Sequence, residues 1–356
     1  METKDGLDGL RIEGTLRTIL ERVLGVERTD GLMRVLVVPR ALAAEGEPGP
    51  ERIETELEAS RAVLAQALNM LLFSDLLERV PAANRYVARA IVLGRTVLHD
   101  HGAVRTVALQ GMGALPAGEE SIVRVLRPLG YALHGVYPLE RLKMTGRSYA
   151  QVDMPEEIAQ FFLSELHPER FSPEFQAAVA RVTASSVDPL SDEAKLLLAQ
   201  LEQQGKLPVE DAVRLLPVLA GCFGRHHAEP AEQDYELLLK ESAEMAWIAT
   251  EGNVFNHVTD RVADVDALAA EQKALGEPMK ETVERSQTGR VRQTAFHAAR
   301  VVRRFRTAAG TLSEREVPGS FLEFITRLPV EEEGGKLDLG FDSSNAQAIF
   351  KMTAGS

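Results

Sequence analysis

The chain has 356 residues, of which 45% are hydrophobic and 26% charged, so it can form one large domain or two smaller ones with a sizeable core. The net charge of −13 argues against a surface built for nucleic acid, and no apolar run reaches the length of a membrane helix. A single cysteine, Cys222, excludes an intrachain disulfide and a cysteine-rich metal site, so we expect a cytoplasmic protein without a nucleic-acid or membrane partner.

Helical periodicity dominates residues 1–98. Apolar residues recur at three- and four-residue spacing within 16–24, 52–77 and 84–98. A Gly/Pro-rich break at 46–50 separates the first two of these stretches. We expect this N-terminal segment to pack as helices on a sheet that later residues form.

Residues 99–155 change to a mixed pattern. Stretches 104–109, 131–137 and 148–154 are typical of strands, whereas 119–129 is typical of a helix that ends at Gly130. The order predicts a β-α-β-β module.

Residues 156–245 return to helical periodicity, which suggests a helical insertion, and residues 246–330 repeat the mixed pattern. In this second module we expect a helix at 264–275 closed by Gly276, and strands at 254–259, 279–285, 292–300 and 320–328. The basic cluster at 300–306 is expected to be a solvated strand or loop edge, and residues 331–356 form a C-terminal tail.

The pattern His-x-x-x-Arg occurs in both modules, as His101 to Arg105 and as His257 to Arg261. Both the histidines and the arginines are separated by 156 residues. The repeat predicts an α+β fold with a duplicated β-α-β-β(-β) core, into which the N-terminal and central helices are integrated.

Equivalent strands of two such modules can bring His101 and His257 together. Glu323, on a later strand, can add a carboxylate. Two imidazoles and one carboxylate leave coordination positions open on a non-haem Fe(II) ion for O2 and for a bidentate 2-oxo acid. Zn and Mn remain open on ligand type alone.

Four further residues are candidates for the pocket. Arg105 shares a strand face with His101 and can hold the far carboxylate of a dicarboxylic acid. Arg261 follows the same logic, although Asp260 and Asp264 are close enough in sequence to pair with it. Gln293 and His297 fall on one face of the strand expected at 292–300, and either can line the cavity.

Other histidines offer weaker alternatives. His99 and His101 could form the His-x-His pair of a cupin, but no carboxylate follows between 105 and 115. Adjacent His226 and His227 point in different directions and are expected to be structural. The chain shows neither a nucleophile signature around Cys222 nor a nucleotide-binding glycine motif.

Four motifs in order resemble the 2-oxoadipate dioxygenase/decarboxylase family, also called hydroxyglutarate synthases, whose fold is similar to that of vicinal-oxygen-chelate enzymes. The motifs are His101–Arg105, Phe255–Thr259 followed by Asp264–Asp266, Arg292–Phe296 and Gly319–Phe324. The resemblance implies Fe(II) bound by His101, His257 and Glu323, a substrate carboxylate held by Arg105, and conversion of 2-oxoadipate and O2 to 2-hydroxyglutarate and CO2.

The sequence departs from this family at two places. Asp260 stands where many relatives have proline, and the tail 341–350 does not match the substrate-contacting end of longer members. The resemblance therefore supports metal binding more strongly than it supports the identity of the oxo acid. Two other functions stay open: another vicinal-oxygen-chelate metalloenzyme, namely a lyase, an isomerase or an extradiol dioxygenase, and a non-enzymatic binding module of the same fold.

Overall fold

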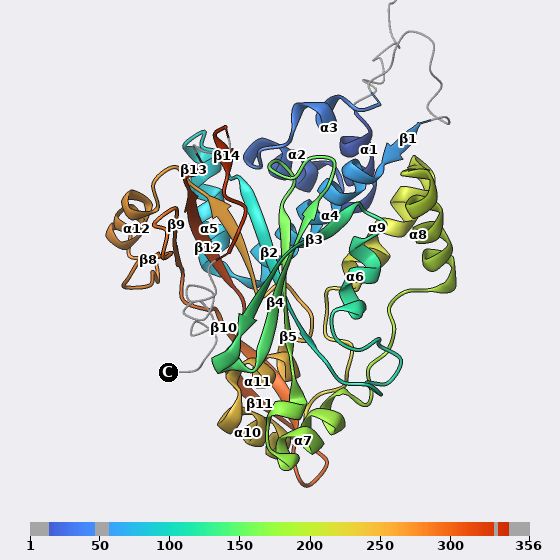
Figure 1. Cartoon of the computed structure of the whole chain (residues 1–356), viewed down its shortest axis with the longest axis vertical. Coiled ribbons are helices and arrows are strands. Elements are labelled where there is room, and N and C mark those ends of the chain that lie inside the picture. Colours follow the sequence, from blue (N-terminus) through green and yellow to red (C-terminus); the bar gives the residue numbers. More distant parts are fainter. Residues whose placement is uncertain (1–13, 47–56, 331–333, 342–356) are drawn as a thin grey trace, which may run out of the picture.

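A computed structural model describes residues 14–46, 57–330 and 334–341, and its centre is a curled sheet of eight strands (Figure 1). The order across the sheet is β3-β4-β5-β2-β7-β12-β9-β8. These strands are β2 (His99–Val107), β3 (Tyr131–Leu139), β4 (Met144–Gln151), β5 (Gln160–Leu166), β7 (His257–Arg261), β8 (Glu284–Arg285), β9 (Val291–Ala295) and β12 (Phe321–Arg327).

The sheet consists of two halves with the same topology, which meet at the antiparallel pair β2 and β7. In the first half β2 runs parallel to β5, and β4 and β3 follow in antiparallel pairs. In the second half β7 runs parallel to β12, and β9 and β8 follow in antiparallel pairs. One helix follows the first strand of each half, α6 (Glu120–Leu126) and α12 (Val265–Ala274). The predicted α+β fold with a duplicated core is therefore confirmed.

The register of the central pair relates the halves residue by residue. His101 lies opposite Thr259, and Ala103 lies opposite His257. A twofold rotation through this pair therefore exchanges His101 with His257 and Ala103 with Thr259. Over residues 101–103 and 257–259, each residue corresponds to the one 156 positions later.

Two hydrophobic cores cover the sheet. The first joins one sheet face to the N-terminal helices and two central ones: α1 (Thr15–Leu24), α2 (Val26–Val35), α3 (Arg40–Ala44), α4 (Arg61–Arg79), α5 (Pro81–Val92), α8 (Asp192–Gln204) and α9 (Val209–Gly221). The second joins the ends of the strands to α7 (Pro173–Thr183), α10 (Glu232–Glu241), α11 (Ala243–Glu251) and the hairpin of β10 (Arg300–Arg306) with β11 (Leu312–Pro318). The described residues of the N-terminal segment are mostly helical, apart from the short strand Glu58–Ser60.

Smaller elements complete the described chain. They are the strand pairs β1 (Glu58–Ser60) with β6 (Lys206–Pro208) and β13 (Pro329–Val330) with β14 (Lys336–Leu337), and the 3-10 helices Glu140–Leu142 and Pro168–Arg170.

Local sequence signals set several helix ends. At the start of α4, the hydroxyl oxygen of Ser60 accepts a hydrogen bond from the Val63 N–H. At the start of α12, the Asp264 carboxylate accepts hydrogen bonds from two backbone N–H groups. Gly130 and Gly276 follow α6 and α12 with φ of 82° and 76°, a conformation that favours glycine. Both glycines lie where the sequence predicts helix closure.

The structure differs from the sequence prediction in the two modules. Residues 160–166, expected to begin a helical insertion at 156, form β5 at the centre of the first half. All seven residues are buried, so they show no alternation of polar and apolar side chains. The strands expected at 279–285 and 292–300 are shorter, because β8 covers two residues and β9 ends at Ala295. Part of the helix expected at 52–77 and most of the tail lie outside the described residues.

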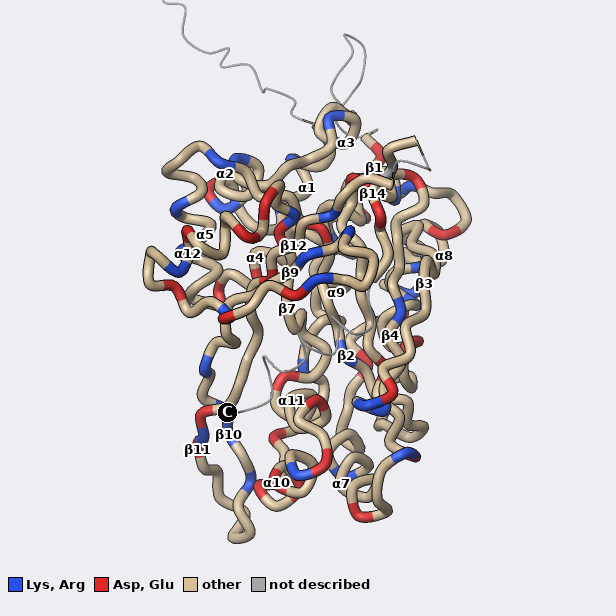
Figure 2. Tube along the Cα trace, turned by 60° about the vertical axis from the view of Figure 1, so that its left-hand side comes forward, with Lys and Arg blue, Asp and Glu red and all other residues tan. Residues whose placement is uncertain are grey.

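The basic cluster at 300–306 forms β10, an exposed strand in which three of the four arginines face acidic side chains. Arg300, Arg303 and Arg304 pair with Glu316, Glu251 and Glu229 at 3.0, 2.7 and 3.0 Å. Figure 2 shows basic and acidic residues interspersed along this hairpin and the neighbouring helices. None of the helices in the described ranges has the length and apolar character to cross a bilayer.

Candidate metal centre

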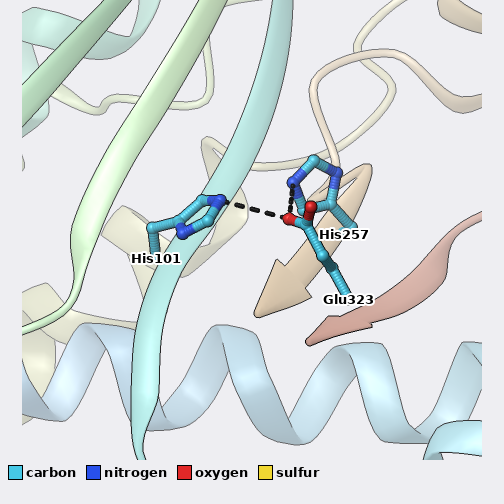
Figure 3. A group of neighbouring side chains, drawn as sticks. All are labelled: His101, His257 and Glu323. Atoms are coloured by element: carbon cyan, nitrogen blue, oxygen red, sulfur yellow. Dashed lines mark ion pairs between the residues drawn. The ribbon is translucent and has the colours of Figure 1, made fainter. Parts of the chain in front are cut away.

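The three residues that the sequence predicts as ligands converge in one face of the sheet (Figure 3). Glu323 Oε2 lies 3.4 Å from His101 Nε2 and 3.2 Å from His257 Nε2. All three side chains are buried, and one ligand atom from each lies within 4.8 Å of the others. They meet because β7 is the neighbour of both β2 and β12.

Each imidazole is held through its Nδ1 atom by the preceding residue. His101 Nδ1 lies 2.8 Å from Asp100 Oδ1, and His257 Nδ1 lies 3.0 Å from Asn256 Oδ1. An acceptor at Nδ1 keeps the proton there and leaves Nε2 with a lone pair for a metal. Both Nε2 atoms face the carboxylate of Glu323, and each imidazole in its neutral form can present a lone pair there to a metal.

The hydroxyl of Thr259 ties the group together. It donates to Glu323 Oε2 at 2.7 Å and lies 3.1 Å from His101 Nε2. On the other side of the site, the ring of Phe321 stacks on His257 at 4.8 Å between centroids. These contacts restrict the rotamers of all three candidate ligands.

The electrostatics of the group favour a bound cation. Burial favours the neutral acid, but His257 and His101 outweigh it and hold the pKa of Glu323 well below its usual range. Burial also favours neutral imidazoles and lowers the pKa of His257, whereas Asp100 and Glu323 together raise the pKa of His101. A divalent ion bound here could neutralise the buried carboxylates in place of the proton that His101 otherwise carries.

Asp100 is itself held by a buried arginine. Arg327 donates to both carboxylate oxygens, with Nη2 2.9 Å from Oδ1 and Nε 3.0 Å from Oδ2. Despite burial, Arg327 and His101 lower the pKa of Asp100. The Nη1 group of Arg327 also donates to the carbonyls of Asp338 and Gly340 at 2.8 and 2.7 Å.

The described end of the chain contacts the site through Phe341. Its ring lies 4.8 Å from that of His101 and 4.7 Å from that of Phe162, between centroids. The guanidinium of Arg327 lies 4.9 Å from the same ring. This part of the tail therefore forms one wall of the site.

Arg105 lies four residues beyond His101 on β2, which is about 13 Å of strand rise. It is 1% exposed and is the largest of the fully buried side chains. Burial lowers its pKa to about 10, opposed by Glu244, so the guanidinium remains charged at neutral pH. Its charge acts on the candidate ligands, since it contributes to the lowered pKa of His257.

The twofold relation of the halves shows on which side a bound metal would have an open coordination position, because no fourth donor is present there among the described residues. Glu323 pairs with Thr259, and the corresponding residue of the first half, which pairs with Ala103, is Phe162. An apolar ring thus stands where symmetry would place a second carboxylate. Three donors with this open side fit a divalent ion that also binds small molecules.

The other predicted pocket residues differ in where the structure places them. Gln293 is buried on β9 opposite Ile325, two pairs along from Glu323, and therefore shares its sheet face. Arg261 contacts Asp100 at 3.7 Å rather than its sequence neighbours Asp260 and Asp264.

The placement of His297 on a strand face is wrong. The strand ends at Ala295, and His297 is exposed, with its backbone N–H bonded to the carbonyl of Pro278. The alternation that predicts a cavity-lining side chain does not extend to this position.

The remaining histidines have structural contacts. A bulge between His99 and His101 turns His99 against Phe73 at 5.5 Å, away from a cupin-like pair. His226 and His227 bond to the carbonyls of Cys222 and Ala249.

Four residues of the site are not among the predicted ones: Asp100, Asn256, Thr259 and Arg327. A signal existed for the first two, since each directly precedes its histidine and the two share the spacing of 156 residues. Thr259 and Arg327 act through contacts across strands, which no spacing along the chain reveals.

The chain matches a family model described as 2-oxoadipate dioxygenase/decarboxylase over residues 68–348. It is 26% identical over 276 residues to the 2-oxoadipate dioxygenase/decarboxylase of Pseudomonas putida, a match that covers 73% of this chain and 59% of that longer relative.

Solved structures give two further likenesses. A glyoxalase superfamily protein from Ralstonia eutropha JMP134 is 52% identical, with a TM-score of 0.86 over 92% of this chain and 98% of that one. The hydroxyglutarate synthase of Oryza sativa, solved with 2-oxoadipate, is 18% identical and has a TM-score of 0.64 over 86% and 97% of the two chains. At that identity the second likeness shows the shared fold.

Proposed function

This chain belongs to the 2-oxoadipate dioxygenase/decarboxylase family, and from this membership we propose that it is an Fe(II)-dependent dioxygenase and decarboxylase. Its substrate is a 2-oxo dicarboxylic acid similar to 2-oxoadipate. The reaction balances as one 2-oxo acid and one O2 giving one CO2 and one 2-hydroxy acid that is shorter by one carbon. For 2-oxoadipate that product is 2-hydroxyglutarate.

The observation that carries the proposal is the convergence of His101, His257 and Glu323 within 4.8 Å. Two neutral imidazoles and one carboxylate hold a divalent ion by three positions and leave the others for reactants. Fe(II) in that position would supply the activation of O2. Mn(II) and Zn(II) fit the same donors, so the assay has to identify the metal.

The residues around the site have separate tasks. Asp100 and Asn256 hold the imidazoles, each through Nδ1. Arg105, on the same strand face as His101, is placed to bind the distal carboxylate of a dicarboxylic acid. The side of Phe162 and Ala103 provides no fourth donor, which leaves coordination positions of the metal for the 2-oxo acid end of the substrate.

The decisive experiment loads the metal-free protein with Fe(II) under anaerobic conditions and then measures O2 uptake and CO2 release with 2-oxoadipate. We expect stoichiometric uptake and release in the wild type, and a loss of at least about 100-fold in His257→Ala. His297→Ala is the matched control, because it removes an exposed imidazole outside the site. Equal rates in wild type and His257→Ala would contradict the proposed role of His257.

The same assay separates the alternatives. Turnover of a chelating substrate without O2 uptake, supported by Zn(II) or Mn(II), would favour another vicinal-oxygen-chelate enzyme. A melting temperature that does not respond to Fe(II), Mn(II) or Co(II) would favour a binding module without a metal.

A further inference from the structure

The guanidinium of Arg105 rests against an indole ring. Trp247 of α11 lies with its ring centroid 4.9 Å from Arg105 Cζ, and both side chains are almost fully buried, at 1% and 3% exposed. A guanidinium stacked on an aromatic face is restricted in plane and position, and it gains attraction from the ring.

The indole is itself fixed. Trp247 Nε1–H donates to the carbonyl of Gly319 at 3.0 Å, just before β12 begins. The segment after α11 also bonds to the strand, since the Asn253 amide donates to the backbone carbonyl of Arg105 at 2.7 Å. Side chain and backbone of Arg105 are thus both located by the α11 segment.

The first turn of α11 adds a countercharge. Glu244 is buried, accepts a hydrogen bond from Ser242, and opposes the effect of burial on the Arg105 guanidinium. An aromatic face and a nearby carboxylate together keep this cation buried at the far end of β2.

The second half of the sheet lacks this arrangement at the corresponding arginine. Arg261 contacts Asp100 at 3.7 Å and donates to the carbonyl of Glu156 at 2.9 Å. It is therefore engaged with the framework around His101. Only one of the two equivalent arginines stands on an aromatic platform, and that platform comes from the helices between the two modules.

We propose that Trp247 is a positioning residue which fixes the guanidinium of Arg105 and thereby sets the chain length of the dicarboxylate that the enzyme prefers. The inference rests on the proposed function. With the platform in place, the distance between the metal ligands and the guanidinium is constant, so one spacing of carboxylates fits best. Without the indole, the long arginine side chain can adjust to shorter or longer dicarboxylates, but it binds each of them more weakly.

The test compares wild type with Trp247→Leu on four 2-oxo acids. Three are dicarboxylates of increasing length, 2-oxoglutarate, 2-oxoadipate and 2-oxopimelate, and the fourth is 2-oxohexanoate, which lacks the distal carboxylate. In the variant we expect KM for 2-oxoadipate to rise on the order of 10-fold and the preference among the three lengths to flatten. KM for 2-oxohexanoate should change less than about twofold, because that substrate makes no contact with Arg105.

Two further variants serve as controls. Tyr235→Leu removes another buried aromatic side chain of the same hydrophobic core without touching Arg105, and should leave the length preference unchanged. Trp247→Phe keeps an aromatic face but loses the bond to Gly319, so it should restore part of the preference. It also replaces Trp247→Leu in the test if the leucine variant does not fold.

Binding can be followed without turnover, because Trp247 is the only tryptophan of the chain. In anaerobic Zn(II)-loaded protein, 2-oxoadipate should change the tryptophan emission, and 2-oxohexanoate should change it less. No binding and no turnover of any 2-oxo acid in the wild type would overturn the proposed function. Normal wild-type turnover, with unchanged KM and length preference in the Trp247 variants, would overturn the positioning role alone.

Discussion

The two candidate imidazole ligands differ in the residue behind them. A carboxylate, Asp100, faces Nδ1 of His101, whereas an amide, Asn256, faces Nδ1 of His257. A carboxylate makes an imidazole a stronger donor to a metal than an amide does. The residues are equivalent in the duplicated sheet, so this difference distinguishes two otherwise similar ligands.

Asp100→Asn tests this difference. The substitution should weaken divalent-metal binding by roughly 10- to 100-fold, because it removes the charge behind His101 and leaves Arg327 without its carboxylate partner. Titration of the metal-free protein with Zn(II) against a competing chelator measures the change. Asp188→Asn is the control, since Asp188 pairs with Arg124 in another part of the molecule. Equal metal affinity in wild type and Asp100→Asn would show that the carboxylate does not tune the ligand.

At the level of strands, β5 and β12 are equivalent but not interchangeable. Each runs parallel to the first strand of its half, yet β12 presents Glu323 where β5 presents Phe162. The phenyl ring contacts Phe341 and Tyr137, so this side of the site is lined by apolar rings and offers no donor to a metal. The unequal strands convert a symmetric scaffold into a site with one open side.

Phe162→Glu should close that side. A fourth donor would bind the metal more tightly while occupying a position that a reactant needs, so O2 uptake should fall at least about 10-fold. Metal affinity and O2 uptake are measured on the same preparation. Phe162→Leu is the control for lost aromatic volume, and it should retain the metal affinity of the wild type. Undiminished O2 uptake by Phe162→Glu with metal bound would contradict the assignment of the open side.

A buried carboxyl joins helix α5 to strand β7. Asp260 accepts hydrogen bonds from the Tyr86 hydroxyl at 2.6 Å and from the Leu98 N–H at 2.9 Å. Burial nevertheless raises its pKa from 3.8 to about 6. A carboxyl with a higher pKa in the folded state destabilises the fold once ionised. This cost is absent at low pH, grows between pH 3.8 and about 6, and is complete above.

Asp260→Asn should therefore stabilise the protein at neutral and higher pH. The amide oxygen can accept from Leu98 while the amide nitrogen donates to Tyr86, so both contacts survive. We expect the free energy of unfolding to increase by up to about 3 kcal/mol near pH 8 and by little near pH 4. Urea denaturation across this range measures it, with Asp266→Asn as an exposed control. A gain that is the same at both pH values would rule out ionisation as the cause.

On the scale of the whole molecule, the candidate site joins both halves of the sheet. His101 belongs to the first half, and His257 and Glu323 belong to the second. A metal bound to all three acts as a link across the β2–β7 junction, and it binds the folded state only.

Metal binding should accordingly stabilise the whole fold. At 100 times Kd, a ligand of the folded state adds about 2.7 kcal/mol to the free energy of unfolding. Denaturant unfolding with and without Zn(II) measures the gain. His101→Ala should lose it and His297→Ala should keep it. A gain that persists in His101→Ala would place the bound metal elsewhere.

The architecture is predictable from the sequence because the duplication of the sheet is visible in the spacing of residues along the chain. His101 and His257 mark equivalent strands, and Gly130 and Gly276 mark equivalent helix ends. The prediction fails at β5, because a parallel strand buried on both faces lacks the alternation that identifies strands.

Within the site, sequence alone cannot show that Arg327 supports Asp100, since 227 residues separate them and only strand pairing brings them together. The surface position of His297 is missed for a related reason. Its strand ends early, where the chain leaves the sheet toward the β10–β11 hairpin.

The position of β12 near the end of the described chain has a consequence for biosynthesis. The ribosome delivers β2 and its histidine more than 200 residues before Glu323 of β12. Domains fold as their segments emerge, and contacts between distant segments form late. The first half therefore leaves the ribosome with a single imidazole donor, and the nascent chain cannot capture a metal at full strength until β12 has emerged. Metal loading therefore has to follow the synthesis of β12, and products truncated before β12 would not compete for the ion.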